Sequence, residues 1–74
     1  MGVLQMSKAE LIARMTDYLK DACDCVAVGD RKMFYYNAGK AEAIYHMLWD
    51  MFRWDIKFCD EHIQNMLDII LENW

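Results

Sequence analysis

The sequence predicts a small all-α protein, a three-helix bundle with an up-down-up arrangement. The chain has 74 residues, of which 57% are hydrophobic, with no proline and three glycines. Because proline and glycine are the poorest helix formers, their scarcity leaves long segments free to be helical. Apolar residues recur at spacings of three and four, which predicts helices at about 7–28, 31–52 and 60–73. A chain of this length holds one hydrophobic core, so we expect residues 1–74 to form a single helical domain.

The first helix, at 7–28, has clear signals at both ends. Ser7 and Glu10 have the spacing of a capping box, in which the serine hydroxyl accepts from an unpaired backbone amide. Gly29 can adopt the left-handed conformation that ends a helix, and Asp30 can cap the next one. The apolar stripe of this helix is formed by Ile12, Met15, Leu19, Ala22 and Val26.

The second helix, at 31–52, contains a glycine, and two interpretations of it are open. Gly39 costs about 1 kcal/mol relative to alanine inside a helix. A turn at Asn37–Gly39 would split the segment. We favour a continuous helix in which Ala38, Gly39 and residues 41–43 form a small-residue strip against a neighbouring helix. The stripe keeps its phase across the glycine, and it comprises Phe34, Ala38, Ala41, Tyr45, Leu48 and Phe52.

The segment between the second and third helices has two possible structures. Trp54, Ile56 and Phe58 alternate with polar residues, a period of two that favours an extended connection. Asp60 and Glu61 then suit the first turn of a new helix, where the helix dipole favours acids. In the alternative, one stripe runs from Tyr45 to Trp74. The chain would then be a helical hairpin with a long C-terminal helix, from 40 to 74, that dimerises to bury itself.

The second helix carries more apolar residues than one buried face needs. A bundle helix usually has about three apolar positions in seven, and in a bundle of three no helix is surrounded. We therefore expect part of this surface to stay exposed and to contact a partner protein or a second copy of the chain. The acidic residues that follow should steer the encounter. The predicted partner-binding residues are Tyr35, Tyr36, Met47, Trp49, Met51, Trp54, Asp60 and Glu61.

The charge balance disfavours other classes of partner. Twelve acidic residues against eight basic ones give a net charge of −4, whereas nucleic-acid-binding domains usually carry a basic patch. We expect no direct contact with nucleic acid. No apolar run is long enough for a membrane span, so we expect no membrane association. The first residues do not resemble a signal peptide, and the three cysteines are an odd number, which together predict a cytoplasmic location.

Residues that could support chemistry are sparse. The chain has no glycine-rich phosphate loop, and its only serine is Ser7, predicted to be a cap. We therefore expect no enzymatic activity, no catalytic residues and no cofactor. The alternative function is a small metal- or redox-responsive helical domain that uses Cys59 and His62, with Cys23 or Cys25 from the first helix. The paired spacings of a structural zinc site do not occur, so we predict no metal site.

In size and composition, the chain resembles the small acidic helical proteins of phages and mobile elements, although no motif carries this resemblance. Such proteins often bind a host protein and modulate or inhibit it. Together with the apolar second helix, this resemblance implies a non-enzymatic protein-interaction module. We expect its partner to be another protein or a second copy in a homo-oligomer.

Overall fold

The structure is a computed structural model that describes residues 7–55 and 60–74, and every regular element in these ranges is a helix. Helix α1 spans Lys8–Val28, α2 spans Arg31–Phe52 and α3 spans Glu61–Asn73. The prediction of a small all-α bundle with three helices is confirmed. Ser7 caps α1, as the capping box predicts, whereas Asp60, which was expected in the first turn of the third helix, is the residue that caps α3.

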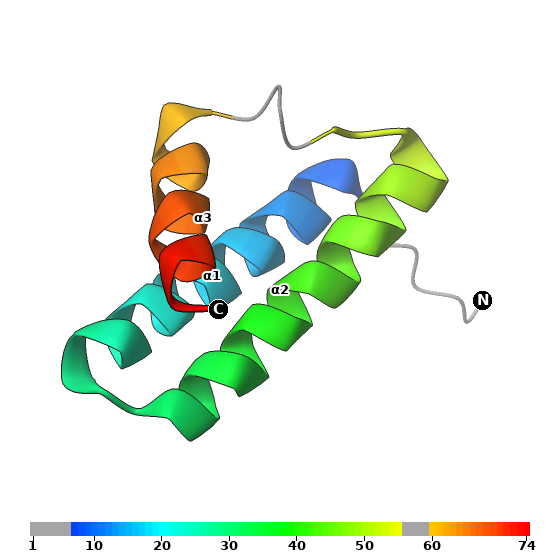
Figure 1. Cartoon of the computed structure of the whole chain (residues 1–74). Helices are drawn as coiled ribbons and strands as arrows, with labels where there is room; N and C mark the ends of the chain where they lie inside the picture. Colours follow the sequence, from blue (N-terminus) through cyan, green and yellow to red (C-terminus); the bar gives the residue numbers. More distant parts are fainter. Residues whose placement is uncertain (1–6, 56–59) are drawn as a thin grey trace.

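Helix α1 is the central helix, and α2 and α3 both pack against it (Figure 1). Helices α1 and α2 run side by side in opposite directions and form a hairpin. Helix α3 crosses α1 at an angle and packs more closely on α1 than on α2. Helices α2 and α3 therefore both pack on α1 but have little contact with each other. In the described ranges, no helix combines the length and the apolar character that crossing a membrane requires.

Local capping sets the helix starts. The Ser7 hydroxyl accepts a hydrogen bond from the Glu10 amide at 3.1 Å, and the Asp30 carboxylate accepts one from the Met33 amide at 3.2 Å. Between α1 and α2, Gly29 takes the predicted left-handed conformation, with φ of 77°. The turn is tight because the glycine lacks the Cβ that penalises this conformation.

The alternative of one continuous helix over 40–74 is wrong, because α2 ends at Phe52. The next residue, Arg53, has a φ of 54°, which lies in the left-handed region. Its amide donates to the Trp49 carbonyl at 2.9 Å, and the Trp54 amide donates to the Leu48 carbonyl at 3.3 Å. These bonds satisfy the last carbonyls of α2 and turn the chain away from the helix axis. Residues 53–55 are not helical, and the rest of the predicted extended connection lies outside the described residues.

The hydrophobic core lies where α2 and α3 meet α1. Met15 on α1 and Leu48 on α2 are the largest side chains that are completely buried. Ile63, Met66 and Ile70 are the buried residues of α3. Each helix buries one face, as the spacings of three and four predict. The buried apolar residues are Leu11, Met15, Leu19, Ala22, Phe34, Ala38, Ala41, Ile44, Leu48, Ile63, Met66 and Ile70.

The predicted small-residue strip on α2 is wrong in part. Ala38 and Ala41 are buried, but Gly39 and residues 42 and 43 are exposed, and no atom lies within 4 Å of where a Cβ on Gly39 would stand. Successive helical residues are rotated by roughly 100°, so Gly39 cannot share the buried face with both alanines. The buried face of α2 instead includes Asn37, whose side-chain amide donates to the Cys25 sulfur at 3.6 Å.

Candidate protein-binding surfaces

One side of α2 carries exposed methionine and tyrosine side chains. Met33, Tyr36, Met47 and Met51 are separated by 3, 11 and 4 residues, which places them on one side of the helix. We call these four residues the methionine surface. All four are exposed, from 42% for Met47 to 58% for Met51. The expectation that α2 leaves apolar side chains exposed is therefore confirmed at these positions.

Lys40 adds a cation to the methionine surface. Its ammonium lies over the Tyr36 ring, 5.4 Å from the ring centroid, within the range of a cation–π interaction. The methionine surface is thus a row of flexible apolar side chains with a basic group beside its aromatic member. Methionine side chains adapt to irregular surfaces, and tyrosine is a frequent anchor at interfaces.

Two other predicted binding residues, Tyr35 and Trp49, lie on the opposite side of α2. Tyr35 contacts Trp74 with ring centroids 5.4 Å apart. Trp49 is 14 residues further along, close to four helical turns, so it shares that side of α2. Both are exposed to about the same extent as Met47. The predicted anchors on α2 therefore form two separate surfaces, one of which faces α3.

The remaining predicted binding residues serve partly structural roles. Trp54 is half-buried, and its ring lies edge-on to Tyr45 with centroids 6.3 Å apart. The Asp60 carboxylate caps α3 by accepting from the His62 amide at 2.8 Å and the Ile63 amide at 3.4 Å. Glu61 is exposed in the first turn of α3. Trp54 therefore contacts α2, whereas Asp60 and Glu61 lie at the start of α3.

An apolar groove lies between α2 and α3, and α1 forms its floor. We call it the α2–α3 groove. Its volume is about 260 Å³, and it is open to solvent on one side. The small side chains of Ala38 and Ala41 leave this space between the two walls. The lining residues are Met15 and Leu19 on the floor, Ala38, Ala41, Glu42 and Tyr45 on α2, and Gln64, Leu67, Ile70, Leu71 and Trp74 on the α3 side.

The α3 wall of this groove contains the residues that sequence reasoning missed. Leu71 is 67% exposed although it lines the groove, and Trp74 is 58% exposed. The Trp74 ring contacts both Phe34 and Tyr35, so it closes the groove at the first turn of α2. In a helical projection, Leu67, Leu71 and Trp74 lie on one side of the third segment. This pattern is the feature of the sequence that indicates an apolar surface there.

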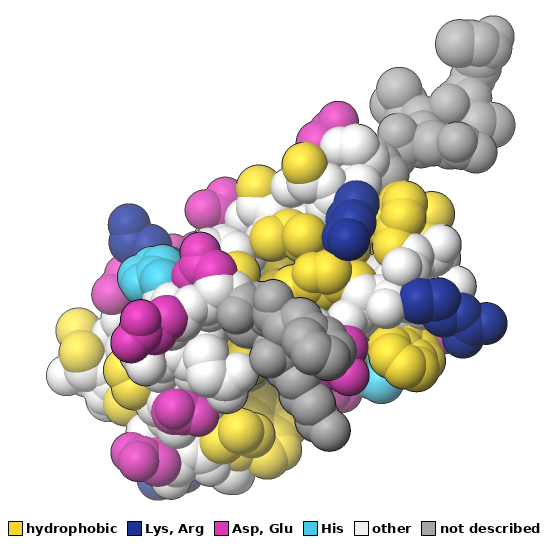
Figure 2. Space-filling view, turned by 90° about the horizontal axis from the view of Figure 1, so that it is seen from above, with side chains coloured by type: hydrophobic (Ala, Val, Ile, Leu, Met, Phe, Trp, Pro, Cys, Tyr) yellow, Lys and Arg dark blue, Asp and Glu magenta, His cyan; other side chains and the backbone are white. Residues whose placement is uncertain are grey.

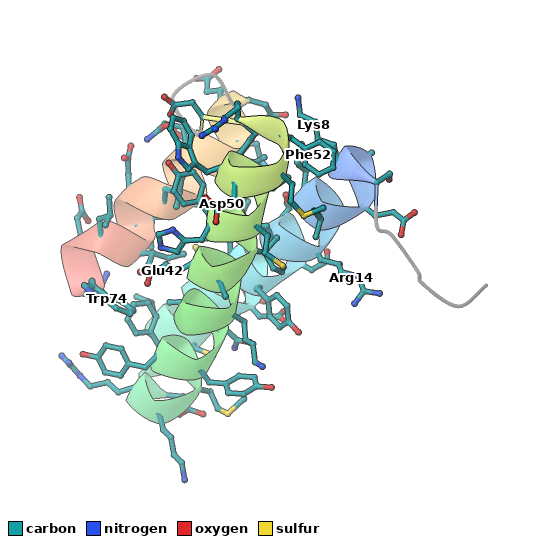
Figure 3. The ribbon with its side chains drawn as sticks, turned by 90° about the vertical axis from the view of Figure 1, so that its right-hand side faces the viewer. Lys8, Arg14, Glu42, Asp50, Phe52 and Trp74 are labelled. Carbon is teal, nitrogen blue, oxygen red and sulfur yellow. The ribbon has the colours of Figure 1, made fainter. Side chains whose placement is uncertain are left out.

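Acidic side chains border the groove. Glu42 lines the α2 wall, and Figure 3 shows it on the side of α2 toward Trp74, whereas Arg14 lies on the other side of the molecule. On α3, Gln64 lines the groove and donates a 3.4 Å hydrogen bond to the Asp68 carboxylate. Figure 2 shows acidic side chains on the left of that view, with hydrophobic and a few basic side chains among them.

The cysteines of α1 are engaged with the core. The Cys23 thiol donates to the Met66 carbonyl at 3.6 Å, and Cys25 accepts from Asn37. Burial, with a smaller contribution from the nearby Asp24 charge, raises the pKa of the Cys23 thiol above its usual value. A raised pKa lowers the thiolate fraction and so the reactivity of this cysteine at neutral pH.

Within residues 7–55 and 60–74, no three His, Cys, Asp or Glu side chains are grouped as a metal site would need. Cys59, which the metal- or redox-responsive alternative requires, lies outside the described residues. His62 is exposed in the first turn of α3. Comparison of the chain with known protein families, curated proteins and solved structures finds no match.

Proposed function

We propose that this chain is a non-enzymatic protein-interaction module that docks a partner protein, or a second copy of itself, through the exposed apolar side chains of α2. The observation that carries the proposal is the methionine surface, because four large apolar side chains of one helix stay exposed after the core is complete. Clustered exposed apolar side chains are typical of protein-binding sites.

The composition of the methionine surface supports binding by close, adaptable packing. Methionine has three rotatable bonds and fits differently shaped partners. Tyr36, with Lys40 over its ring, supplies an aromatic anchor and a positive charge at one end. A module of this kind modulates or inhibits its partner by covering part of the partner's surface, as the resemblance to small phage proteins implies.

The groove chemistry favours binding over catalysis. Most of its lining is apolar, and its ionisable side chains are Glu42 and Tyr45. Acid–base catalysis needs positioned groups with a shared target, and these two side chains stand among aliphatic neighbours. We therefore assign no catalytic residue and no cofactor to the chain.

Site-specific photocrosslinking tests the proposal. A benzophenone amino acid is placed at Met47, on the methionine surface, or at Ala13, which is exposed on α1. Each chain is irradiated in cells of the organism that encodes it. We expect a discrete crosslinked product from position 47, either with one partner or with a second copy, and none from position 13. Equal products from both positions, or none from either, would contradict the proposal.

A further inference from the structure

We infer that the α2–α3 groove binds a basic amphipathic helix of another protein. This inference rests on the proposed function in that both make the chain a protein-binding module. It concerns a different surface, however, because none of the four residues of the methionine surface lines the groove. The two sites can therefore be tested, and can fail, separately.

The shape of the groove matches a helix. Helices α2 and α3 both rest on α1 but contact each other little, which leaves the groove between them accessible to a further helix. The α3 wall runs from Gln64 to Trp74, a length of about 15 Å at 1.5 Å per residue. This is close to three helical turns. The small side chains of Ala38 and Ala41 on the α2 wall leave room for bulky side chains to enter.

The exposed side chains of the α3 wall indicate that the part of the occupant that enters the groove is apolar. Leu71 and Trp74 are both more than half exposed beside a groove whose lining is mostly apolar. An aliphatic stripe on the incoming helix would cover Leu71 and fill the space above Met15 and Leu19. Helices that bind such grooves insert residues at i, i+3, i+4 and i+7.

The charge around the groove indicates that the occupant is basic. Helix α3 carries Glu61, Asp68 and Glu72 and has no lysine or arginine, so the helix beside the groove has a net negative charge, although its lining residues are uncharged. Glu42 adds a negative charge on the α2 wall. Lysine and arginine on the sides of an incoming helix would pair with these acids and speed its approach. A second copy would bring a net charge of −4 to the same place, which disfavours self-association here.

Two matched substitutions on α3 test the site. Leu71→Lys puts a charge into the groove wall, and Ile69→Lys puts the same charge on the far side of the same helix, because residues two apart are rotated by roughly 200°. Both residues are exposed, at 67% and 43%, so neither change removes core packing. Circular dichroism checks that both variants keep their helices. Because both raise the net charge by one, they weaken non-specific attraction to a basic peptide equally.

The probe is a synthetic helix of roughly 16 residues with leucines at i, i+3, i+4 and i+7 and lysines elsewhere. One control peptide has the same composition with the leucines moved out of the stripe, and another has glutamate in place of lysine. Binding is measured by titration, and its location by NMR shifts of the Ala38, Ala41, Leu67 and Leu71 methyl groups. A second pair of variants, Asp68→Lys near the groove and Asp17→Lys on α1, tests the charge separately.

The proposal predicts saturable binding with shifts at the groove methyl groups. Leu71→Lys should weaken it about tenfold or more, and Ile69→Lys by no more than about twofold. Asp68→Lys should weaken it more than Asp17→Lys. The proposal is wrong if the probe does not bind, if either control peptide binds equally, or if Leu71→Lys and Ile69→Lys have equal effects. It is also wrong if light scattering shows a dimer that Leu71→Lys dissociates, since a second copy would then occupy the groove.

The outcomes separate the two proposals. If the probe fails to bind but the position 47 crosslink forms, the groove inference fails and the proposed function stands. If the probe binds in the groove but position 47 gives no product, the assignment of the methionine surface fails instead. The deciding experiment for the groove is the probe titration of Leu71→Lys beside Ile69→Lys.

Discussion

The Trp74 ring meets the Phe34 ring edge-on, with their centroids 6.1 Å apart. This contact joins the residue that follows α3 to the first turn of α2, two helices that otherwise contact each other little. Tyr35 meets the same indole at 5.4 Å, so three rings form one cluster at the end of the groove. We expect this cluster to help hold α2 and α3 together at this end of the groove.

Trp74→Ala should therefore destabilise the fold by about 1–2 kcal/mol, because edge-to-face aromatic pairs contribute beyond their buried area. Urea denaturation followed by circular dichroism measures the change. Met51→Ala is a matched control, since both side chains are 58% exposed and Met51 lies on the open methionine surface. Equal losses in the two variants would show that the aromatic cluster does not connect α2 and α3.

The two described glycines should respond to alanine in opposite directions. Gly39→Ala should stabilise the protein by about 0.5–1 kcal/mol, because the position is mid-helix and nothing lies within 4 Å of the new Cβ. Gly29→Ala should destabilise it by about 1 kcal/mol, because φ there is 77°. Denaturation midpoints measure both effects. A stabilising Gly29→Ala change would be incompatible with the left-handed turn between α1 and α2.

The cap of α3 should depend on an acceptor at residue 60. Asp60→Ala removes the oxygen that accepts from the His62 and Ile63 amides, and should cost about 1 kcal/mol. In a domain of this size, that corresponds to a fall in melting temperature of roughly 4–8 °C. Asp60→Asn retains an acceptor and should lose much less. If the asparagine variant melts as low as the alanine variant, the charge of Asp60 matters rather than its cap.

Cys23 should make the protein less stable at alkaline pH. Its pKa in the folded state is raised above the ordinary value of 9.0, first by burial and then by Asp24. The stability from the protonated thiol is fully present below the unfolded pKa and is lost as pH rises through the folded pKa. Urea denaturation at about pH 8 and about pH 10 should show a smaller decline for Cys23→Ala than for the natural chain. Identical declines would mean that Cys23 has no part in this loss.

The helix boundaries could be predicted from the sequence because their causes are local. Ser7, Asp30 and Asp60 accept hydrogen bonds from amides two or three residues away, and the Gly29 turn depends on a single residue. The end of α2 was harder to predict. Arg53 takes a left-handed conformation without the glycine that usually indicates it, so a continuous helix stayed possible in the sequence.

The division of α2 into two exposed surfaces could not be predicted, because it depends on where α3 packs. The apolar residues around α2 show an excess over one buried face, but not which side faces another helix. Asn37 illustrates the same limit. It has the phase of the buried face, but the sequence does not show that the Cys25 sulfur accepts a hydrogen bond from its side-chain amide. The groove and its Trp74 end arise only from the tertiary arrangement.

The central claim, that the methionine surface docks a protein, is tested most directly by competition against the position 47 crosslink. Excess natural chain should suppress the crosslinked product, because it occupies the same partner surface. Chain carrying Met51→Lys should compete much more weakly, since it places a charge on the methionine surface while the core is unchanged. Equal suppression by the two chains would contradict the claim, because the partner would then be held by some other part of the molecule.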